Sequence, residues 1–133
     1  MKINGLDGRL HVWNLANYHN RPSTNPSSNH LRCRELLLTI WPSETILEEV
    51  GLPDVNLRLD FYLPRQRLAL EVHGEAHYSY IPHFHKHRIG YANSIKRDNR
   101  KKEWCELNHI TLIELPHTED LTEWKTRIIE KRT

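Results

Sequence analysis

Hydrophobic and polar residues alternate most regularly over residues 57–73, which read LRLDFYLPRQRLALEVH. An alternation with a period of two is typical of β-strands. The run Pro-Arg-Gln-Arg at 64–67 interrupts the alternation and has the composition of a turn. The pattern therefore predicts two antiparallel strands, Leu57–Leu63 and Leu68–His73.

The register of this hairpin follows if the two leucines that flank the turn, Leu63 and Leu68, face each other. Phe61 then faces Leu70, and apolar residues cover one entire side of the ribbon. A slip of one residue would mix apolar and polar residues on both sides. The alternation therefore supports this register over its neighbours.

The rest of the chain predicts further elements by the same signals of periodicity, turns and caps. In chain order these are a short hairpin over 1–15, a loop or arm over 18–30, a helix over 29–41, a strand within 43–53, a helix over 92–107, a strand over 109–115 and a helix over 119–132. Residues 43–53 also suit a short helix, and the strand is favoured. The segment 18–30 is either an arm that follows DNA or a linker packed on the surface.

Capping and burial are predicted for each helix. Ser27 or Ser28 caps the first helix, Asn108 ends the second in the left-handed conformation, and Thr118 caps the third. The expected inward residues are Leu31, Leu37, Leu38 and Trp41 in the first helix, and Leu121, Trp124 and Ile128 in the last. The order of elements predicts an α/β sandwich with a mixed central sheet and an N-terminal hairpin.

Length and composition limit the domain organisation and the cellular location of the protein. The 133 residues suit a single domain, with a hairpin and arm at 1–28 and a core at 29–133. Two separated cysteines without CxxC spacing, and no long apolar run or signal-like start, predict an intracellular, cytoplasmic protein without membrane contact. If a phage encodes it, the host cell provides that setting. No obligate protein partner is evident, and a monomer and a homodimer are both open.

Two acids in the hairpin are the first candidates for chemistry. In the expected register Asp60 faces Glu71, and opposed carboxylates repel each other. A shared proton, a basic neighbour or a divalent cation must compensate. Mg²⁺ or Mn²⁺ suits such a pair, because hard ions are held by one or two carboxylates and keep waters for phosphate substrates. The alternative is a surface pair neutralised by Arg58 and Arg67.

Two histidines lie close to this pair in the sequence. His73 follows Glu71 by two residues and so projects from the same face of the strand, where an imidazole can take a proton from water. His77, beyond Gly74, can reach the same place from a loop. The alternative for each is a structural histidine.

These residues resemble a known pattern. Asp60 followed by Glu71-Val72-His73 resembles the D…(D/E)-x-K signature of the PD-(D/E)XK restriction-endonuclease-like superfamily, with His in place of Lys. The segment DFYLPRQRLALEVHG is more similar to the very short patch repair endonucleases, in which an aspartate begins a similar strand and a histidine stands in an H-G motif. Residues 93–115 resemble that family's basic helix and last core strand, so the resemblance spans about residues 57–115.

The resemblance implies roles for the hairpin residues. By this resemblance Asp60 and Glu71 are metal-binding acids, although the repair endonucleases have an apolar residue at the position of Glu71. The backbone carbonyl of Val72 becomes a further metal ligand, and His73 acts on the water or the phosphate. The resemblance therefore implies a metal-dependent DNA endonuclease that nicks one strand, in a repair, phage or homing setting.

Three residues outside this core carry weaker implications. Glu35 resembles the helical acid that some members direct at the site, and a solvated helix residue is the alternative. His77 approximates the second histidine of the repair branch, one residue early, and Lys96 is the alternative to His73 as substitute for the lysine. The structural zinc of the repair family is in doubt, because Glu75 stands where one of its cysteine ligands would be.

Basic residues gather before and along the second helix, against one acid. The expected DNA-binding residues are Arg88, Lys96, Arg97, Arg100, Lys101 and Lys102. A solvated helix face is the alternative. His83, His85 and His87 alternate nearby and could hold zinc with His77 or Cys105, although their spacing fits no standard pattern. Two rival functions therefore stay open: a non-catalytic RNA- or DNA-binding module similar to the RAP domains, and a zinc-stabilised interaction domain.

Overall fold

The structure is a computed structural model that describes residues 1–74 and 88–132. In chain order its elements are β1 (Lys2–Asn4), β2 (Leu10–Val12), the 3-10 turn η1 (Leu15–Tyr18), α1 (Ser28–Ile40), β3 (Leu47–Gly51), β4 (Arg58–Leu63), the 3-10 turn η2 (Pro64–Gln66), β5 (Leu68–His73), α3 (Arg88–Leu107), β6 (Thr111–Pro116) and α4 (Leu121–Arg132). The expected order of hairpin, helix, three strands, helix, strand and helix is confirmed. Residues 43–53 form a strand, as favoured.

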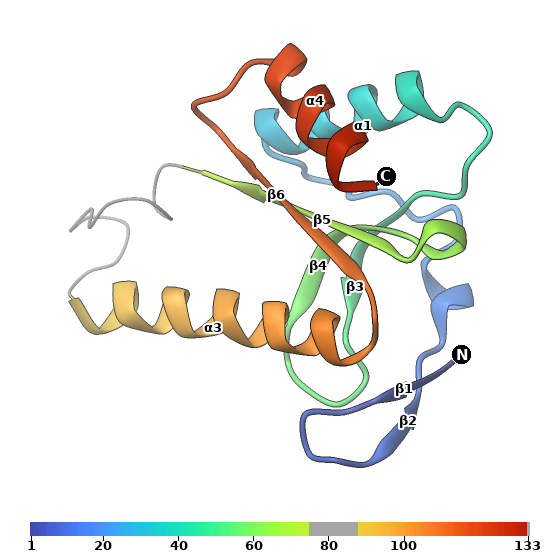
Figure 1. Cartoon of the computed structure of the whole chain (residues 1–133), viewed down its shortest axis with the longest axis vertical. Coiled ribbons are helices and arrows are strands. Elements are labelled where there is room, and N and C mark those ends of the chain that lie inside the picture. Colours follow the sequence, from blue (N-terminus) through green and yellow to red (C-terminus); the bar gives the residue numbers. More distant parts are fainter. Residues whose placement is uncertain (75–87, 133) are drawn as a thin grey trace.

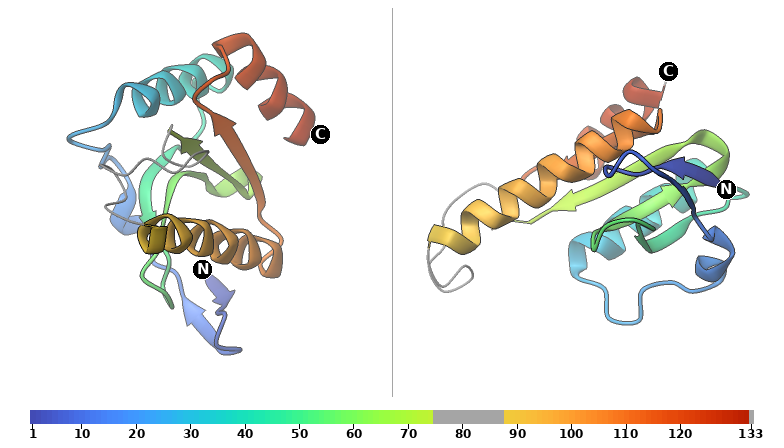
Figure 2. Two further views of the ribbon diagram at one scale, coloured as in Figure 1. Left: turned by 90° about the vertical axis from the view of Figure 1, so that its left-hand side faces the viewer. Right: turned by 90° about the horizontal axis from the view of Figure 1, so that it is seen from below.

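The central sheet is mixed, and helices cover both of its faces. Its strand order is β3-β4-β5-β6; β3, β4 and β5 are antiparallel neighbours, and β6 runs parallel to β5. The helix α3 lies on one face, whereas α1 and α4 lie together on the other (Figures 1 and 2). The predicted α/β sandwich with a mixed sheet is therefore confirmed, together with the small antiparallel hairpin of β1 and β2.

The register of the β4–β5 hairpin is the predicted one. Leu63 pairs with Leu68 and Phe61 pairs with Leu70. The turn closes through Arg67, whose φ of 49° places it in the left-handed region. The leucines that flank the turn therefore set the pairing, as the alternation required.

The prediction of a single apolar side for this hairpin was wrong, because both faces of the sheet carry a hydrophobic core. Leu59, Tyr62 and Ala69 belong to the cluster that contains Trp104 of α3. Phe61 and Leu70 belong to the cluster that contains residues of α1 and α4. In a three-layer sandwich both sides of a central strand are buried. The alternation in the sequence then identifies only the positions that carry polar residues, and does not show which side is buried.

The buried face of α1 also differs from the prediction. Ser27 caps the helix as expected, accepting the N–H of His30. Leu37 is buried, but Leu31 and Leu38 are exposed. His30 and Cys33 are buried in their place. His30 stacks on Phe61 and its Nε2 lies 2.8 Å from Glu48 Oε1, so a polar residue occupies a position that hydrophobicity assigns to solvent.

The ends of the later helices required two corrections. His109, with φ 55°, adopts the left-handed conformation after α3, whereas Asn108 uses its side chain to bond the N-terminal hairpin. The helix α4 is capped by Asp120, which accepts the N–H of Glu123, and not by Thr118. Leu121 is consequently exposed at the start of α4, while Trp124 and Ile128 are buried as expected.

The N-terminal hairpin and the segment after it are packed on the sheet. Trp13 is buried with its ring centroid 4.9 Å from that of Trp104, and its indole N–H donates to Gly51 O at 2.8 Å. Farther along, Ser23 N–H donates to Glu48, which also accepts two hydrogen bonds from Arg34. None of the helices in residues 1–74 and 88–132 is long and apolar enough to span a membrane.

Candidate active site

Asp60 and Glu71 meet where strands β4 and β5 separate. The pairing of the two strands runs from Leu63↔Leu68 to Phe61↔Leu70. At the next position Asp60 N–H donates to Glu71 Oε2, and Val72 N–H donates to Asp60 Oδ2, both at 2.8 Å. Each carboxylate thus satisfies a backbone donor of the opposite strand. This arrangement agrees with the predicted opposition of the two acids.

The sheet is irregular at this point, and the irregularity brings in a third acid. The pairs Glu48↔Phe61 and Val50↔Leu59 bracket Glu49 and Asp60, which therefore stand opposite each other on β3 and β4. Glu49 has a φ of 48°, which is strained for a residue with a long side chain. Glu49, Asp60 and Glu71 thus form a row of acids across three neighbouring strands.

A lysine from α3 completes the pair. Lys101 Nζ lies 2.5 Å from Glu71 Oε1, and the exposed fractions of these side chains are 19% and 5%. The sequence placed Lys101 among the DNA-binding residues and proposed Lys96 as the outside candidate for this position. Lys96 is exposed and does not line the hollow beside Asp60. About 1.4 turns of helix separate the two lysines, so the phase of α3 decided which one faces the sheet.

Burial and charge alter the titration of this group. Burial, followed by the negative charge of Asp60, raises the pKa of Glu71 to about 8, although Lys101 acts to lower it. Two adjacent carboxylates in a buried place do not both ionise unless positive charge compensates them. A proton, the Lys101 ammonium and a divalent cation are the candidates for that compensation.

The neighbouring cysteines offer no nucleophile. Burial, with the charge of Glu71, raises the pKa of Cys105 to about 12. Burial also raises the pKa of Cys33, with smaller contributions from Asp60 and Glu48. Thiols that stay protonated are poor nucleophiles and poor metal ligands. This leaves the carboxylates, the lysine and the histidine as the candidate chemical groups of the site.

A polar hollow of about 300 Å³ opens beside the acids. Its lining residues are Glu49, Asn56, Leu57, Arg58, Asp60, Arg97 and Lys101. A second hollow of about 550 Å³ shares Glu49 and Arg58 with the first and extends along residues 17–24. Glu49 and Arg58 therefore stand between the two hollows.

The remaining predicted site residues lie as follows. His73 is buried at the end of β5, two residues after Glu71 and on the same face of the strand. The Val72 carbonyl points to the β4 side, because a residue's N–H and C=O point the same way in a strand and its N–H reaches Asp60. Glu35 is exposed on α1 and does not line the hollow. His77 and the His83, His85, His87 series lie outside the described residues.

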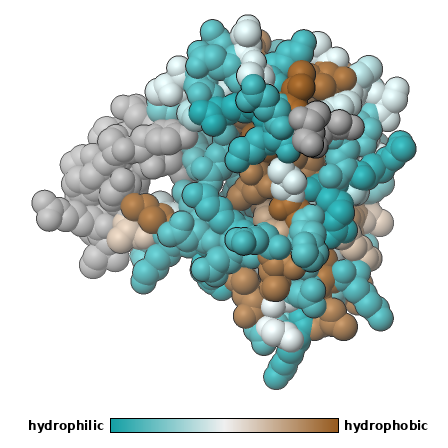
Figure 3. Space-filling view, viewed as in Figure 1, coloured by the Kyte–Doolittle hydropathy of each residue, from teal (hydrophilic) through white to brown (hydrophobic). Residues whose placement is uncertain are grey.

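The predicted basic surface is only partly available for phosphates. Lys96, Arg97 and Arg100 are exposed on α3. Lys102 is exposed but lies 3.1 Å from Glu114, and Lys101 is committed to Glu71. The side chain of Arg88 lies outside the described part of the chain. Figure 3 shows hydrophilic residues covering the exposed side of α3.

The donor set fits a hard divalent cation. Asp60 and Glu71 supply carboxylate oxygens, and Val72 supplies a carbonyl directed to the same side. Oxygen donors of this kind suit Mg²⁺ or Mn²⁺ better than zinc. Burial, followed by the charge of Asp60, raises the pKa of Glu71, and a cation bound between the two acids would favour their charged forms.

The chain is similar to viral proteins. It is 44% identical to "Uncharacterized protein 307L" of Invertebrate iridescent virus 6 over 63 residues, which cover 47% of this chain and 32% of that protein. It is 34% identical to "Uncharacterized protein 033L" of Invertebrate iridescent virus 3 over 68 residues, 51% of this chain and 35% of the relative. It is 38% identical to "Uncharacterized protein 094L" of Frog virus 3 over 69 residues, 50% of this chain and 44% of the relative.

The matched part corresponds to between a third and a half of each viral protein. The chain matches no protein-family profile and no solved structure.

Proposed function

We propose that the protein is a metal-dependent endonuclease of the PD-(D/E)XK type that nicks DNA. The observation that carries this proposal is the group formed by Asp60, Glu71 and Lys101, which lies beside a polar hollow. The superfamily signature requires two acids and a lysine. The sequence lacks the lysine after Glu71, and Lys101 supplies an ammonium at the same carboxylate from a different element.

The residues divide the work of phosphodiester hydrolysis among them. Asp60, Glu71 and the Val72 carbonyl would hold Mg²⁺, which supplies a water of lowered pKa and neutralises charge on the phosphate. The Lys101 ammonium stabilises negative charge beside the acids. His73, on the same face as Glu71, accepts or directs the proton of the attacking water. Arg97 and Arg58 line the hollow and bind the phosphates on either side.

The setting follows from the relatives and from the site. The relatives are viral proteins, so the proposed place of action is the cytoplasm of an infected cell. One active group cuts one strand, so a monomer nicks, and a homodimer would be needed to break both strands together.

A supercoiled plasmid incubated with the protein and Mg²⁺ tests the proposal. The expected result is conversion to the nicked form by the wild type and no conversion by Asp60→Asn. Glu103→Gln, at an exposed glutamate of α3, is the matched control and keeps full activity. Nicking that survives Asp60→Asn would show that a contaminant or another site cuts the DNA.

One observation favours the rival reading as a non-catalytic nucleic-acid-binding module. The oxygens of Glu71 already accept from Lys101 and from Asp60 N–H, so the acid pair can be a structural bridge between β4 and β5. This reading predicts salt-dependent binding of DNA or RNA, with no cleavage in Mg²⁺ or Mn²⁺. Binding that is equal in the wild type and Asp60→Asn, without nicking by either, would favour the module.

A further inference from the structure

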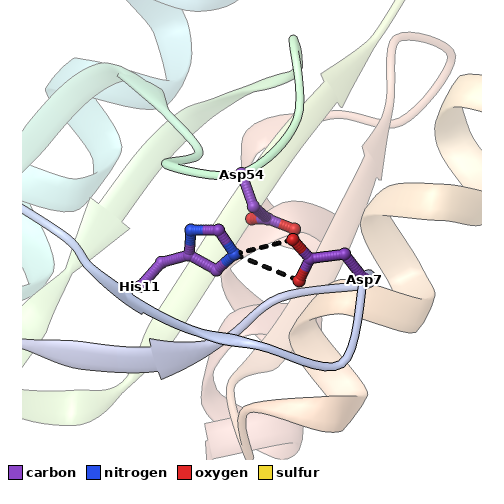
Figure 4. Close-up of side chains that lie close together, drawn as sticks. All are labelled: Asp7, His11 and Asp54. Atoms are coloured by element: carbon purple, nitrogen blue, oxygen red, sulfur yellow. Dashed lines mark hydrogen bonds and ion pairs between the residues drawn. The ribbon is translucent and has the colours of Figure 1, made fainter.

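A separate polar cluster lies between the N-terminal hairpin and the loop that joins β3 to β4. Asp7 and His11 come from the hairpin, and Asp54 comes from the loop (Figure 4). One donor atom of each residue lies within 4.8 Å of the other two. None of the three lines the hollow beside Asp60, so the cluster is independent of the proposed active site.

Hydrogen bonds from residues outside the cluster hold its two carboxylates in place. Asp54 Oδ1 accepts the indole N–H of the buried Trp104, and Asp54 Oδ2 accepts Leu6 N–H, both at 2.9 Å. Asp7 Oδ1 accepts Arg9 N–H at 2.9 Å. These bonds fix the direction of both carboxylates, and donors that are oriented in advance lose less entropy when an ion binds.

Gly5 makes room for the convergence of Asp7 and His11. A Cβ at Gly5 would lie 2.6 Å from Asp7 Oδ1 and 2.8 Å from His11 Nε2, closer than side-chain atoms approach. Gly5 is itself buried, and its N–H donates to Arg9 O. Any side chain at this position would therefore push the ends of the Asp7 and His11 side chains away from their present positions.

The distances between His11 and Asp7 are compatible with one shared ion, and Asp54 places a carboxylate oxygen within 4.8 Å of both. His11 Nε2 lies 3.0 Å from each oxygen of Asp7. Adjacent donors bound to one ion at about 2.0–2.2 Å lie about 2.8–3.6 Å apart in octahedral or tetrahedral geometry. The same distance fits a hydrogen bond, but two carboxylates around one imidazole leave net negative charge even when the imidazole is protonated.

We propose that Asp7, His11 and Asp54 bind a divalent transition-metal ion of the Zn²⁺ class. A set of one imidazole and two carboxylates favours Zn²⁺ over Mg²⁺, which prefers oxygen donors alone. Three protein ligands leave room for a water. The ion ties the turn of the hairpin to the β3–β4 loop and so stabilises the attachment of the N-terminal hairpin to the core.

Zn²⁺ titrated into the chelator-treated full chain tests the proposal by calorimetry. The expected result is a site whose affinity falls more than about a hundredfold in His11→Ala, beyond the loss that a supporting residue commonly causes. His19→Ala, at another exposed histidine of the N-terminal region, is the matched control and keeps the wild-type affinity. Asp60→Asn also keeps it, which separates this site from the proposed active site.

The histidines at 83, 85 and 87 are a second source of zinc binding, so the titration is repeated with all three replaced by alanine. Equal affinity of this variant and of its His11→Ala derivative would overturn the proposal. Co²⁺ absorption supplies a direct readout, and a visible band lost in His11→Ala supports the site. Asp7→Asn, in an exposed turn, replaces His11→Ala if that variant does not fold, and its undiminished Zn²⁺ affinity would likewise overturn the proposal.

Discussion

Lys101 Nζ lies 2.5 Å from Glu71 Oε1, although 30 positions separate the two residues and they come from a helix and a strand. This contact changes what the basic run on α3 is expected to do. One member of the run faces the acids, whereas Lys96, Arg97 and Arg100 remain exposed. Catalysis and binding should therefore separate when individual basic residues are replaced.

Lys101→Ala and Arg100→Ala form a matched pair of substitutions. We expect Lys101→Ala to abolish nicking with at most a modest loss of DNA affinity, because the ammonium acts at Glu71. Arg100→Ala should retain cutting and flatten the salt dependence of binding, by a slope of about one for a lost phosphate contact. Nicking assays and binding isotherms at several salt concentrations measure both. Equal behaviour of the two variants would contradict the assignment of Lys101 to the site.

His73→Ala and His73→Lys address the other candidate for the lysine position. If His73 handles the proton of water, His73→Ala loses nicking, and His73→Lys retains part of it because lysine is the usual residue in the superfamily. Full activity of His73→Ala would exclude His73 from the proton transfer and leave Lys101 as the residue that takes the place of the superfamily's lysine. The measurement is the rate of plasmid nicking at saturating Mg²⁺.

The stability of the protein should fall as the pH rises from about 4.5 to about 8. The pKa of Glu71 is raised from the ordinary glutamate value of 4.5 to about 8 in the folded chain, so the folded state holds a proton that the unfolded state releases across this window. The contribution of the neutral carboxyl is complete below pH 4.5 and is lost toward pH 8. We expect Glu71→Gln to remove this decline, which is a few kcal/mol at most.

Chemical denaturation at pH 5 and pH 8.5 measures that difference in the free energy of unfolding. Glu103→Gln is the control, because this glutamate is exposed. Mg²⁺ should stabilise the wild type more at pH 8.5 than at pH 5, because a metal binds the deprotonated acids. A wild type and Glu71→Gln variant with parallel pH profiles would show that Glu71 ionises normally.

Glu49 is strained and charged at the same place, and these two effects can be separated. Glu49→Asn keeps a residue that tolerates the left-handed conformation but removes the charge. We expect unchanged or slightly increased stability, and a higher Mg²⁺ concentration for half-maximal nicking, because the row of acids loses one member. Glu49→Gly should add stability, up to about 1 kcal/mol, with the same shift in Mg²⁺ requirement. An unaltered Mg²⁺ dependence in both variants would exclude Glu49 from the site.

Glu48 should contribute more to stability than the surface acid Glu119. Glu48 is buried and accepts hydrogen bonds from His30, Arg34 and Ser23, whereas Glu119 pairs with the exposed Arg127. We expect Glu48→Ala to lower the free energy of unfolding by about 3–5 kcal/mol, because it leaves the buried partners of Glu48 without a hydrogen-bond acceptor. Glu119→Ala should lower it by less than about 1 kcal/mol. Urea denaturation of both variants decides between this ordering and its reverse.

The sequence was sufficient to predict the strand register and the opposition of Asp60 and Glu71. Both depend on a local period of two and on a turn four residues long. The sequence was insufficient for Lys101, because α3 is polar on nearly every side and its phase is set by Trp104 and Cys105, which pack into the core. A search for a lysine one helical turn before that buried pair would have found it.

Glu49 escaped prediction for a different reason. Its role depends on the pairing of β3 with β4 and on a break in alternation that moves Leu59 and Phe61 into different cores. Leu31 and Leu38 were predicted to be inward because hydrophobicity alone was counted. The structure instead buries His30, whose partner Glu48 belongs to another element. Polar pairs of this kind are formed between elements and leave no periodic signal in either one.

The bond between Asn108 and Asn4 also affects how the chain is made. Asn108 accepts the N–H of Asn4 and donates to its carbonyl, so residues 104 positions apart satisfy each other. During synthesis the first strand leaves the ribosome long before its partner exists. The N-terminal hairpin therefore lacks this anchor until α3 has been synthesised, and its contacts with the core are complete only after residue 108 has left the ribosome.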